Sequence, residues 1–213
     1  MARRARGAET YARRGPTREP YDFVLIVCEG TKTEPAYFTR LKILHRLSSA
    51  NIKIMPADGN DPMSIITFAE NAASKDDYDR IYCVFDRNEH TNYAAALQRI
   101  ADSSEGKAGR LIAITSWPCF EIWVLLHFKY SSAAFVKTSR ESACDKVVGE
   151  VRRHLRVYVK GYKTIFDELS PKLPTALQNA KRLQRENVET GSDNPGTKVH
   201  DLVEYLLNLK GVA

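Results

Sequence analysis

The first half of the chain alternates short apolar runs with segments of helical periodicity. Each run is about as long as a buried strand, and the runs cover residues 23–28, 52–55, 81–85 and 111–114. Between the first two runs, Tyr37, Phe38 and Leu41 recur at helical spacing. Strands separated by helices indicate βαβ crossovers. We therefore expect an α/β fold with a mainly parallel sheet of about four strands, sandwiched by helices.

Two further helices are expected between the later runs. Asp61 and Pro62 are a favoured N-cap residue and a favoured first helical residue, followed by apolar positions at helical spacing. Residues 94–102 have a similar pattern. The segment 120–128 is apolar nearly all round, which predicts a buried helix.

The second half of the chain has helical patterns and no convincing strand. Val147, Val148 and Val151 share one helical face, and two more amphipathic segments follow near residues 173–183 and 199–206. We expect three parts: a disordered basic arm (1–20), an α/β core (21–130) and a helical extension packed on the core (131–213).

Two of the predicted strands end on acids. Glu29 follows the first apolar run and Asp86 follows the third. Because parallel strands point the same way, both acids are expected at the same edge of the sheet, where ligands bind in such folds. Neighbouring buried carboxylates repel each other, and a divalent cation such as Mg²⁺ relieves that repulsion. The alternatives are an ion pair between Glu29 and Lys32, and helix capping by Asp86.

The loop after Glu29 is predicted to lie above the sheet. The next helix is expected to begin with Glu34 near the N-cap and Pro35 at the first position, or with a capping box between Thr31 and Glu34. Either start leaves Gly30–Thr33 as a loop in which Lys32 can face a phosphate. The loop lacks the spacing of a P-loop.

Further polar residues accompany these acids. Asn88 lies two positions after Asp86, so in an extended segment both side chains point to one side. Arg87 lies between these two residues and His90 follows them, and both are candidate substrate contacts. The alternative for His90 is that it is only solvated, as a lone histidine in a polar loop often is. Glu121 is either a third carboxylate at the same edge or an acid favoured by the helix dipole.

Charge and cysteine content narrow the class of protein. The net charge is +6, and residues 1–20 hold six Arg against two Glu, which favours a polyanion such as nucleic acid or a solvated terminus. The four cysteines stand far apart without a CxxC pair, so reduced thiols are expected. No run is long enough for a signal-peptide core or a membrane span, so we expect a cytoplasmic protein without membrane contact.

Four motifs in this order resemble the RloB family. They are VCEGTKTEPAYF, VFDRNEH, SWPCFEIWVLLHF and NPGTKVHDLVEYL, and the resemblance covers residues 22 to about 209. Members of that family are encoded in restriction-modification and phage-defence loci and are related to the Toprim fold. The resemblance implies a Toprim-like core, cooperation with an ATPase encoded nearby, and phosphodiester chemistry that depends on Mg²⁺ or Mn²⁺.

The resemblance also implies roles for individual residues. Glu29 matches the Toprim glutamate, a metal ligand or general acid/base, and Asp86 matches the first aspartate of an Asp-x-Asp pair. Asn88 departs from that pair, because this sequence has an asparagine where an aspartate is usual. An amide oxygen can still bind a metal ion, but it brings no charge.

Basic residues are the remaining candidates for the site. A second metal ion or Lys163 is expected to steady the leaving oxygen. Arg152, Arg153 and Arg156 line a nucleic-acid groove or form a solvated helix face. The predicted function is a nuclease acting on RNA, tRNA included, or on DNA. The alternative is a non-catalytic nucleic-acid or partner-binding subunit with a degenerate metal site.

Overall fold

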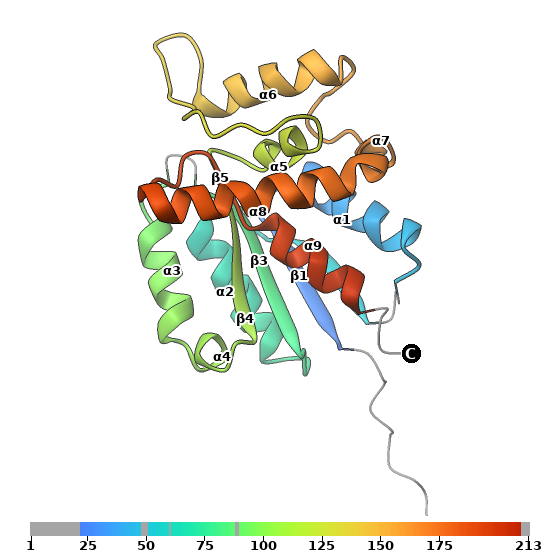
Figure 1. Ribbon diagram of the computed structural model, residues 1–213. Helices are drawn as coiled ribbons and strands as arrows, with labels where there is room; N and C mark the ends of the chain where they lie inside the picture. The colour runs from blue at the N-terminus through green and yellow to red at the C-terminus, as the bar shows by residue number, and fades with distance from the viewer. Residues whose placement is uncertain (1–21, 48–50, 60, 88–89, 210–213) are drawn as a thin grey trace, which may run out of the picture.

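A computed structural model describes residues 22–47, 51–59, 61–87 and 90–209. The predicted basic arm lies outside the described residues. The fold is built on one five-stranded sheet in the order β2-β1-β3-β4-β5 (Figure 1). The strands are β1 (Val24–Cys28), β2 (Ile52–Pro56), β3 (Arg80–Asp86), β4 (Leu111–Trp117) and β5 (Gly196–Thr197). The first four are parallel, and β5 pairs with β4 in the antiparallel direction.

Helices surround this sheet and extend beyond one of its edges (Figure 1). Within the described residues they are α1 (Thr33–Leu44), α2 (Pro62–Ala73), α3 (Tyr93–Asp102), α4 (Ser104–Lys107), α5 (Glu121–Leu126), α6 (Ala143–His154), α7 (Ile165–Leu169), the 3-10 helix η1 (Ser170–Lys172), α8 (Leu173–Thr190) and α9 (Val199–Asn208). None of them is long and apolar enough to cross a membrane.

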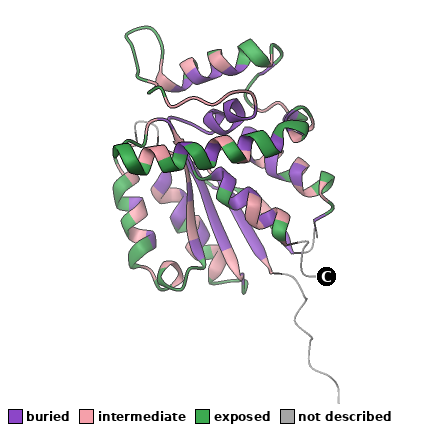
Figure 2. Ribbon diagram, in the orientation of Figure 1, coloured by how far each residue is buried: buried purple, intermediate pink, exposed green. Residues whose placement is uncertain are grey.

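The alternation of side chains along β1 divides the interior into two layers. Leu25 and Val27 point into one core with α2 and α3, whereas Val24, Ile26 and Cys28 point into a larger core on the other face. The larger core also takes buried residues from α1, α5, α6, α8 and α9. Because both faces are covered, the central strands β1 and β3 are buried along most of their length (Figure 2), whereas the edge strand β2 is largely exposed. The α/β prediction with a mainly parallel sheet is confirmed.

Two features of the structure differ from the prediction, an additional strand and the start of α1. The fifth strand was not expected, because β5 has only two residues and shows no apolar run. Helix α1 begins at Thr33 with Lys32 in the N-cap position and without a side-chain cap, so both proposed starts near Thr31, Glu34 and Pro35 are wrong. The Thr33 hydroxyl accepts instead from the backbone N–H of Gly161 at 2.9 Å, from the second half of the chain.

The α2 start agrees with the prediction. Asp61 is the N-cap residue, and its Oδ1 accepts from the backbone N–H groups of Met63 at 3.0 Å and Ser64 at 3.3 Å. The Asn92 side chain donates to the same oxygen at 2.7 Å, which ties the start of α3 to the start of α2. The Ser64 hydroxyl also donates to the other carboxylate oxygen of Asp61. This bond has the largest effect, and together the bonds lower the pKa of Asp61 below its ordinary value.

Replacing this cap should weaken the fold. We expect Asp61→Ala to lower the free energy of unfolding by about 1 to 2 kcal/mol at pH 7, because the N–H groups of Met63 and Ser64 at the start of the helix lose their acceptor. Asp61→Asn should keep most of that stability, since an amide oxygen can also cap. Urea denaturation of the two variants tests this, and equal losses would contradict a capping role.

Candidate functional site

The site begins where β1 and β3 end side by side. Their register pairs Cys28 with Val84, so Glu29 emerges beside Asp86 at the carboxyl edge of the sheet. The backbone N–H of Glu29 donates to the Val84 carbonyl at 2.9 Å. In return, Glu29 Oε2 accepts from the backbone N–H of Asp86 at 2.8 Å. The structure therefore brings together the two acids that the strand ends placed at one edge.

His90 is the second partner of Glu29. Its Nε2 lies 2.9 Å from Glu29 Oε1, and both side chains are mostly buried. The alternative partner, Lys32, makes no ion pair with any described residue. Glu29 is thus fixed by a backbone N–H on one oxygen and by an imidazole on the other, so its orientation is set before any ligand arrives.

Glu34 adds a carboxyl group that the sequence interpretation assigned to helix capping. It is buried in the first turn of α1, and its carboxylate lies directly above Gly30. A Cβ atom at position 30 would overlap the Glu34 carboxylate, so a larger residue there would require the Glu34 side chain to move. The Gly30–Thr33 loop, which was predicted to contact a phosphate, therefore also leaves space for the Glu34 carboxylate.

Glu121 is the fourth acid and is held by the second half of the chain. It is buried at the start of α5, where Tyr158 donates a hydrogen bond to its Oε1 at 2.9 Å. Lys160 Nζ lies 3.8 Å from its Oε2, with over half of the lysine side chain exposed. The carbonyl of Tyr158 accepts from Arg152 Nε at 3.1 Å, which steadies this segment.

These acids influence each other strongly. Asp86 keeps some solvent exposure, yet the surrounding protein and then the charges of Glu34, Glu121 and Glu29 raise its pKa well above the ordinary value. Burial, followed by the charges of Glu121 and Glu29, raises the pKa of Glu34 to about 7. Lys160 opposes both shifts and does not cancel them. Full ionisation of the four acids would therefore place more negative charge at this edge than Lys160 balances, so protonation of Asp86 and Glu34 is favoured without a bound cation.

The four acids are of the chemical type that binds a hard divalent cation. Carboxylate oxygens are the ligands that Mg²⁺ and Mn²⁺ prefer, and Mg²⁺ commonly needs only one or two of them beside water and phosphate. Glu29, Glu34, Asp86 and Glu121 offer such oxygens at one edge of the sheet. No three of these four acids have oxygens that all lie within 4.8 Å of one another, so the described side chains do not form a closed set of ligands. Asn88, the predicted auxiliary ligand, lies outside the described residues.

A disulfide between Cys119 and Cys144 lies beside the acids, so the expectation of four reduced thiols is wrong for this pair. The two cysteines are 25 residues apart, and only the packing of α5 against α6 brings them together. Among the described residues, one group of metal-type ligand atoms lies within 4.8 Å of one another, and it consists of Cys119, Glu121 and Cys144. Because both sulfurs are bonded, this group lacks the thiolates that a metal would need. Cys28 and Cys83 are free and buried.

A basic cavity of about 790 Å³ opens beside the acids. It is lined by Lys32, Lys160 and Lys163, and by Arg40, whose charge is paired with Asp167 at 2.7 Å. Gly161 packs against Lys32 with a positive φ of 84°, so the wall joins the β1–α1 loop to the segment after α6. Lys163 lies in this cavity, whereas Lys160 is the lysine that approaches the acids.

The remaining predicted basic residues are spread out. Arg153 pairs with Glu150 at 2.5 Å, and Arg156 is exposed after the end of α6. Arg87 points away from the acids, where it forms an ion pair with Asp193 and its guanidinium lies 3.6 Å from the centre of the Trp117 ring. None of the arginines at 152, 153 and 156 lines the basic cavity beside the acids.

Three residues of this arrangement were missed from the sequence. Glu34 was a recognisable signal, an acid five positions after Glu29 in a loop that already carried Lys32. Tyr158 and Lys160 are separated from the strand-end acids by more than 70 residues, and only the fold brings them near.

The five-stranded, mostly parallel sheet, the helices on its faces and the acids at its carboxyl edge define an α/β protein consistent with a Toprim-like fold. The model of the RloB-like protein family matches residues 24–206. Because this match spans most of the chain, the protein belongs to the RloB-like family. The chain matches no curated protein and no solved structure.

The raised pKa of Glu34 gives stability a defined pH dependence. Between the ordinary value near 4.5 and the folded value of about 7, the native state binds more protons than the unfolded chain. Wild-type stability should therefore fall as the pH rises through this range. In EDTA, we expect Glu34→Gln to be roughly 1 to 3 kcal/mol more stable than wild type at pH 8 and to approach it at pH 5.

Urea denaturation at both pH values measures the effect of Glu34→Gln. Glu189→Gln is the matched control, because Glu189 is exposed at the end of α8 and forms no ion pair with a described residue. A Glu34→Gln variant that is less stable than wild type at pH 8 would show that the carboxylate is not repelled.

The disulfide should contribute to the same region. It closes a loop of 25 residues, for which chain entropy predicts a loss of about 3 kcal/mol on reduction. We expect dithiothreitol to lower the unfolding midpoint of wild type and to leave the double variant Cys119→Ser, Cys144→Ser unchanged. Thiol titration in denaturant should give two free thiols before reduction and four after it. Four thiols before reduction would contradict the bond.

Proposed function

We propose that this protein is a nuclease that uses a divalent metal ion to hydrolyse phosphodiester bonds in RNA, tRNA included, or in DNA. The observation that carries the proposal is the group of four carboxyl groups at the carboxyl edge of the sheet, with Lys160 as its nearby cation. Such an excess of negative charge favours a cation that a phosphate substrate can share. Membership in the RloB-like family supports the same chemistry.

Asp86, Glu29 and Glu34 are the residues that would hold Mg²⁺ or Mn²⁺, with Asn88 as the amide ligand expected from the sequence. When bound, the ion activates a water molecule and neutralises the charge that develops on the phosphate. Glu29 is oriented by the Asp86 N–H and by His90, so it presents a fixed carboxylate to this place. Glu121 is kept in position by Tyr158 and adds negative charge close enough to influence Asp86.

The basic cavity suggests the path of the nucleic acid. Lys32 and Lys163 line it without an ion pair to any described residue, and Lys160 joins it to the acids. Phosphates of a strand that lies there would be neutralised by these lysines, and the next phosphate would reach the acids. This arrangement gives Lys160, rather than Lys163, the position from which a cation can steady the leaving oxygen.

The family resemblance supports the biological setting. We place the nuclease in bacterial phage defence, in the cytoplasm where the nucleic acids of an infecting phage are found. The same resemblance favours control by an ATPase encoded nearby, which would keep cleavage off until infection.

Cleavage assays with the purified full chain test the proposal. Labelled single-stranded RNA, tRNA and DNA are incubated with Mg²⁺ or Mn²⁺, and parallel reactions contain EDTA. We expect metal-dependent cleavage of at least one substrate, abolished by EDTA, and a loss of about 100-fold or more in Glu29→Gln and Asp86→Asn. Asp102→Asn is the matched control, because this exposed acid ends α3 at the opposite edge of the sheet (Figure 1).

Two results would count against a nuclease. Cleavage that persists in EDTA and in both acid variants would place the activity elsewhere, in a contaminant or another site. Binding of nucleic acid without cleavage under any condition would favour the non-catalytic alternative. Asn88→Asp then distinguishes a weakened active site, which should gain cleavage, from a binding subunit, which should not.

A further inference from the structure

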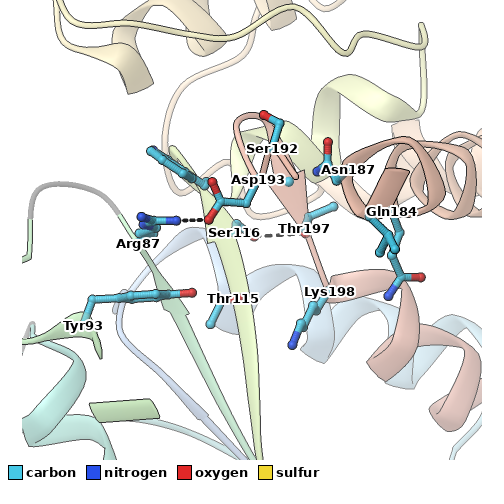
Figure 3. A pocket seen from close by; sticks show the side chains of 13 residues that line it. Arg87, Tyr93, Thr115, Ser116, Gln184, Asn187, Ser192, Asp193, Thr197 and Lys198 are labelled. Atoms are coloured by element: carbon cyan, nitrogen blue, oxygen red, sulfur yellow. Dashed lines mark hydrogen bonds and ion pairs between the residues drawn. The ribbon is translucent and has the colours of Figure 1, made fainter. Parts of the chain in front are cut away.

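A second cavity of about 340 Å³ lies next to the acids on the same edge of the sheet (Figure 3). Asp86 pairs in register with Ser116 of β4, and the N–H of Arg87 donates to the Ser116 carbonyl at 2.8 Å. Both Arg87 and Ser116 line the cavity, together with residues from β5 and α8. A ligand there would therefore lie one strand away from Asp86. The volume is within the range of about 300 to 1,000 Å³ that is typical of small-ligand pockets.

Flat side chains form one wall of this cavity. The Arg87 guanidinium lies 3.6 Å from the centre of the Trp117 ring and 5.4 Å from the centre of the Tyr93 ring. Figure 3 shows Arg87 and Tyr93 side by side, with the Tyr93 ring extending toward Thr115. Aromatic rings and guanidinium planes are the surfaces on which unstacked nucleobases pack.

Polar groups form the opposite side. Asn187 donates through Nδ2 to the Pro195 carbonyl at 2.8 Å, which leaves its Oδ1 as an acceptor for a base edge. Gln184 projects from the same helix and is exposed (Figure 3). Side-chain amides in this setting can accept from and donate to the edge of a base. Ser116 and Thr197 hydroxyls bond to each other at 3.0 Å at the base of the cavity.

The charges of the lining distinguish a base from a charged small molecule. Arg87 is neutralised by its ion pair with Asp193. Lys198 is exposed and forms no ion pair with a described residue, so it leaves one cation for a phosphate. A free nucleoside triphosphate carries several negative charges and would need more cations than this lining offers. One uncompensated lysine suits a single phosphate of a strand.

We propose that this cavity binds one unstacked nucleobase of a single-stranded nucleic acid. The inference rests on the proposed function, because the strand that supplies the base is the one whose phosphodiester enters the acid site. The base stacks against the wall formed by Arg87, Trp117 and Tyr93, its edge meets Asn187, and Lys198 contacts a flanking phosphate. This contact fixes which phosphodiester bond reaches Asp86.

Binding to the full-length Glu29→Gln protein in EDTA tests the pocket without cleavage. The probes are single-stranded RNA and DNA of eight nucleotides, and an abasic strand of the same length that keeps the phosphates. Trp117 lies in the pocket wall and Trp123 is buried elsewhere, so a stacked base should quench tryptophan fluorescence through Trp117. We expect quenching by the base-bearing strands, none by the abasic strand, and none in the Trp117→Phe variant.

Fluorescence anisotropy with labelled strands measures the contribution of the other residues. Tyr93→Leu should weaken binding of the base-bearing strand about 5-fold to 100-fold and leave the abasic strand unchanged. Lys198→Gln should reduce the slope of log affinity against log salt by about 0.7 for both strands. Phe68→Leu on α2 and Lys107→Gln on α4 are matched controls outside both cavities and should have no effect.

Two outcomes would overturn the pocket. One is equal affinity for abasic and base-bearing strands with no effect of Tyr93→Leu, and the other is tighter binding of free ATP than of any strand. These outcomes are separate from the failure of the nuclease. Metal-dependent cleavage with no effect of Tyr93→Leu would keep the nuclease and reject the pocket, whereas base-dependent quenching without cleavage would do the reverse.

Discussion

The Glu29 carboxylate accepts a hydrogen bond from the backbone N–H of Asp86, and this bond joins two strand ends that both carry negative charge. It fixes the spacing of the acids through the sheet register, not through flexible loops. Because Glu34 and Glu121 lie close enough to raise the pKa of Asp86, the edge stays electrostatically strained without a cation. Neighbouring residues hold the acids in place. Gly30 leaves space for the Glu34 carboxylate, His90 lies within hydrogen-bond distance of Glu29, and Tyr158 donates a hydrogen bond to Glu121.

The two halves of the chain divide this work. The sheet and α1 supply three acids, while the segment after α6 supplies Tyr158, Lys160 and the Gly161 N–H that binds Thr33. The Cys119–Cys144 disulfide ties the start of α5 to α6 and so holds Glu121 beside that segment. Two cavities lie next to the acids. The basic cavity is lined by the β1–α1 loop, and the second cavity, which contains Arg87 and Trp117, is lined by β4 and α8.

Two kinds of feature could be predicted from the sequence: elements with a periodic apolar pattern, and residues that stand at the ends of such elements. The apolar runs before Glu29 and Asp86 predicted parallel strands, and parallel strands placed both acids at one edge. Contacts between distant segments left no such pattern. The two-residue β5 has no period to detect, the cysteines pair only through helix packing, and Lys160 resembles Lys163 until the fold shows which one approaches Glu121. Glu34 was assigned to a cap because its local spacing fits that role equally well.

The Gly161–Thr33 hydrogen bond also bears on the order in which the protein is made. A growing chain that has left the ribosome only as far as residue 150 contains Glu29, Glu34, Asp86 and Glu121 but lacks Tyr158, Lys160 and Gly161. It therefore lacks the Tyr158 hydrogen bond and the Lys160 cation that accompany Glu121 in the finished fold. The site is thus completed only after Gly161 has emerged, and β5 and α9 follow it.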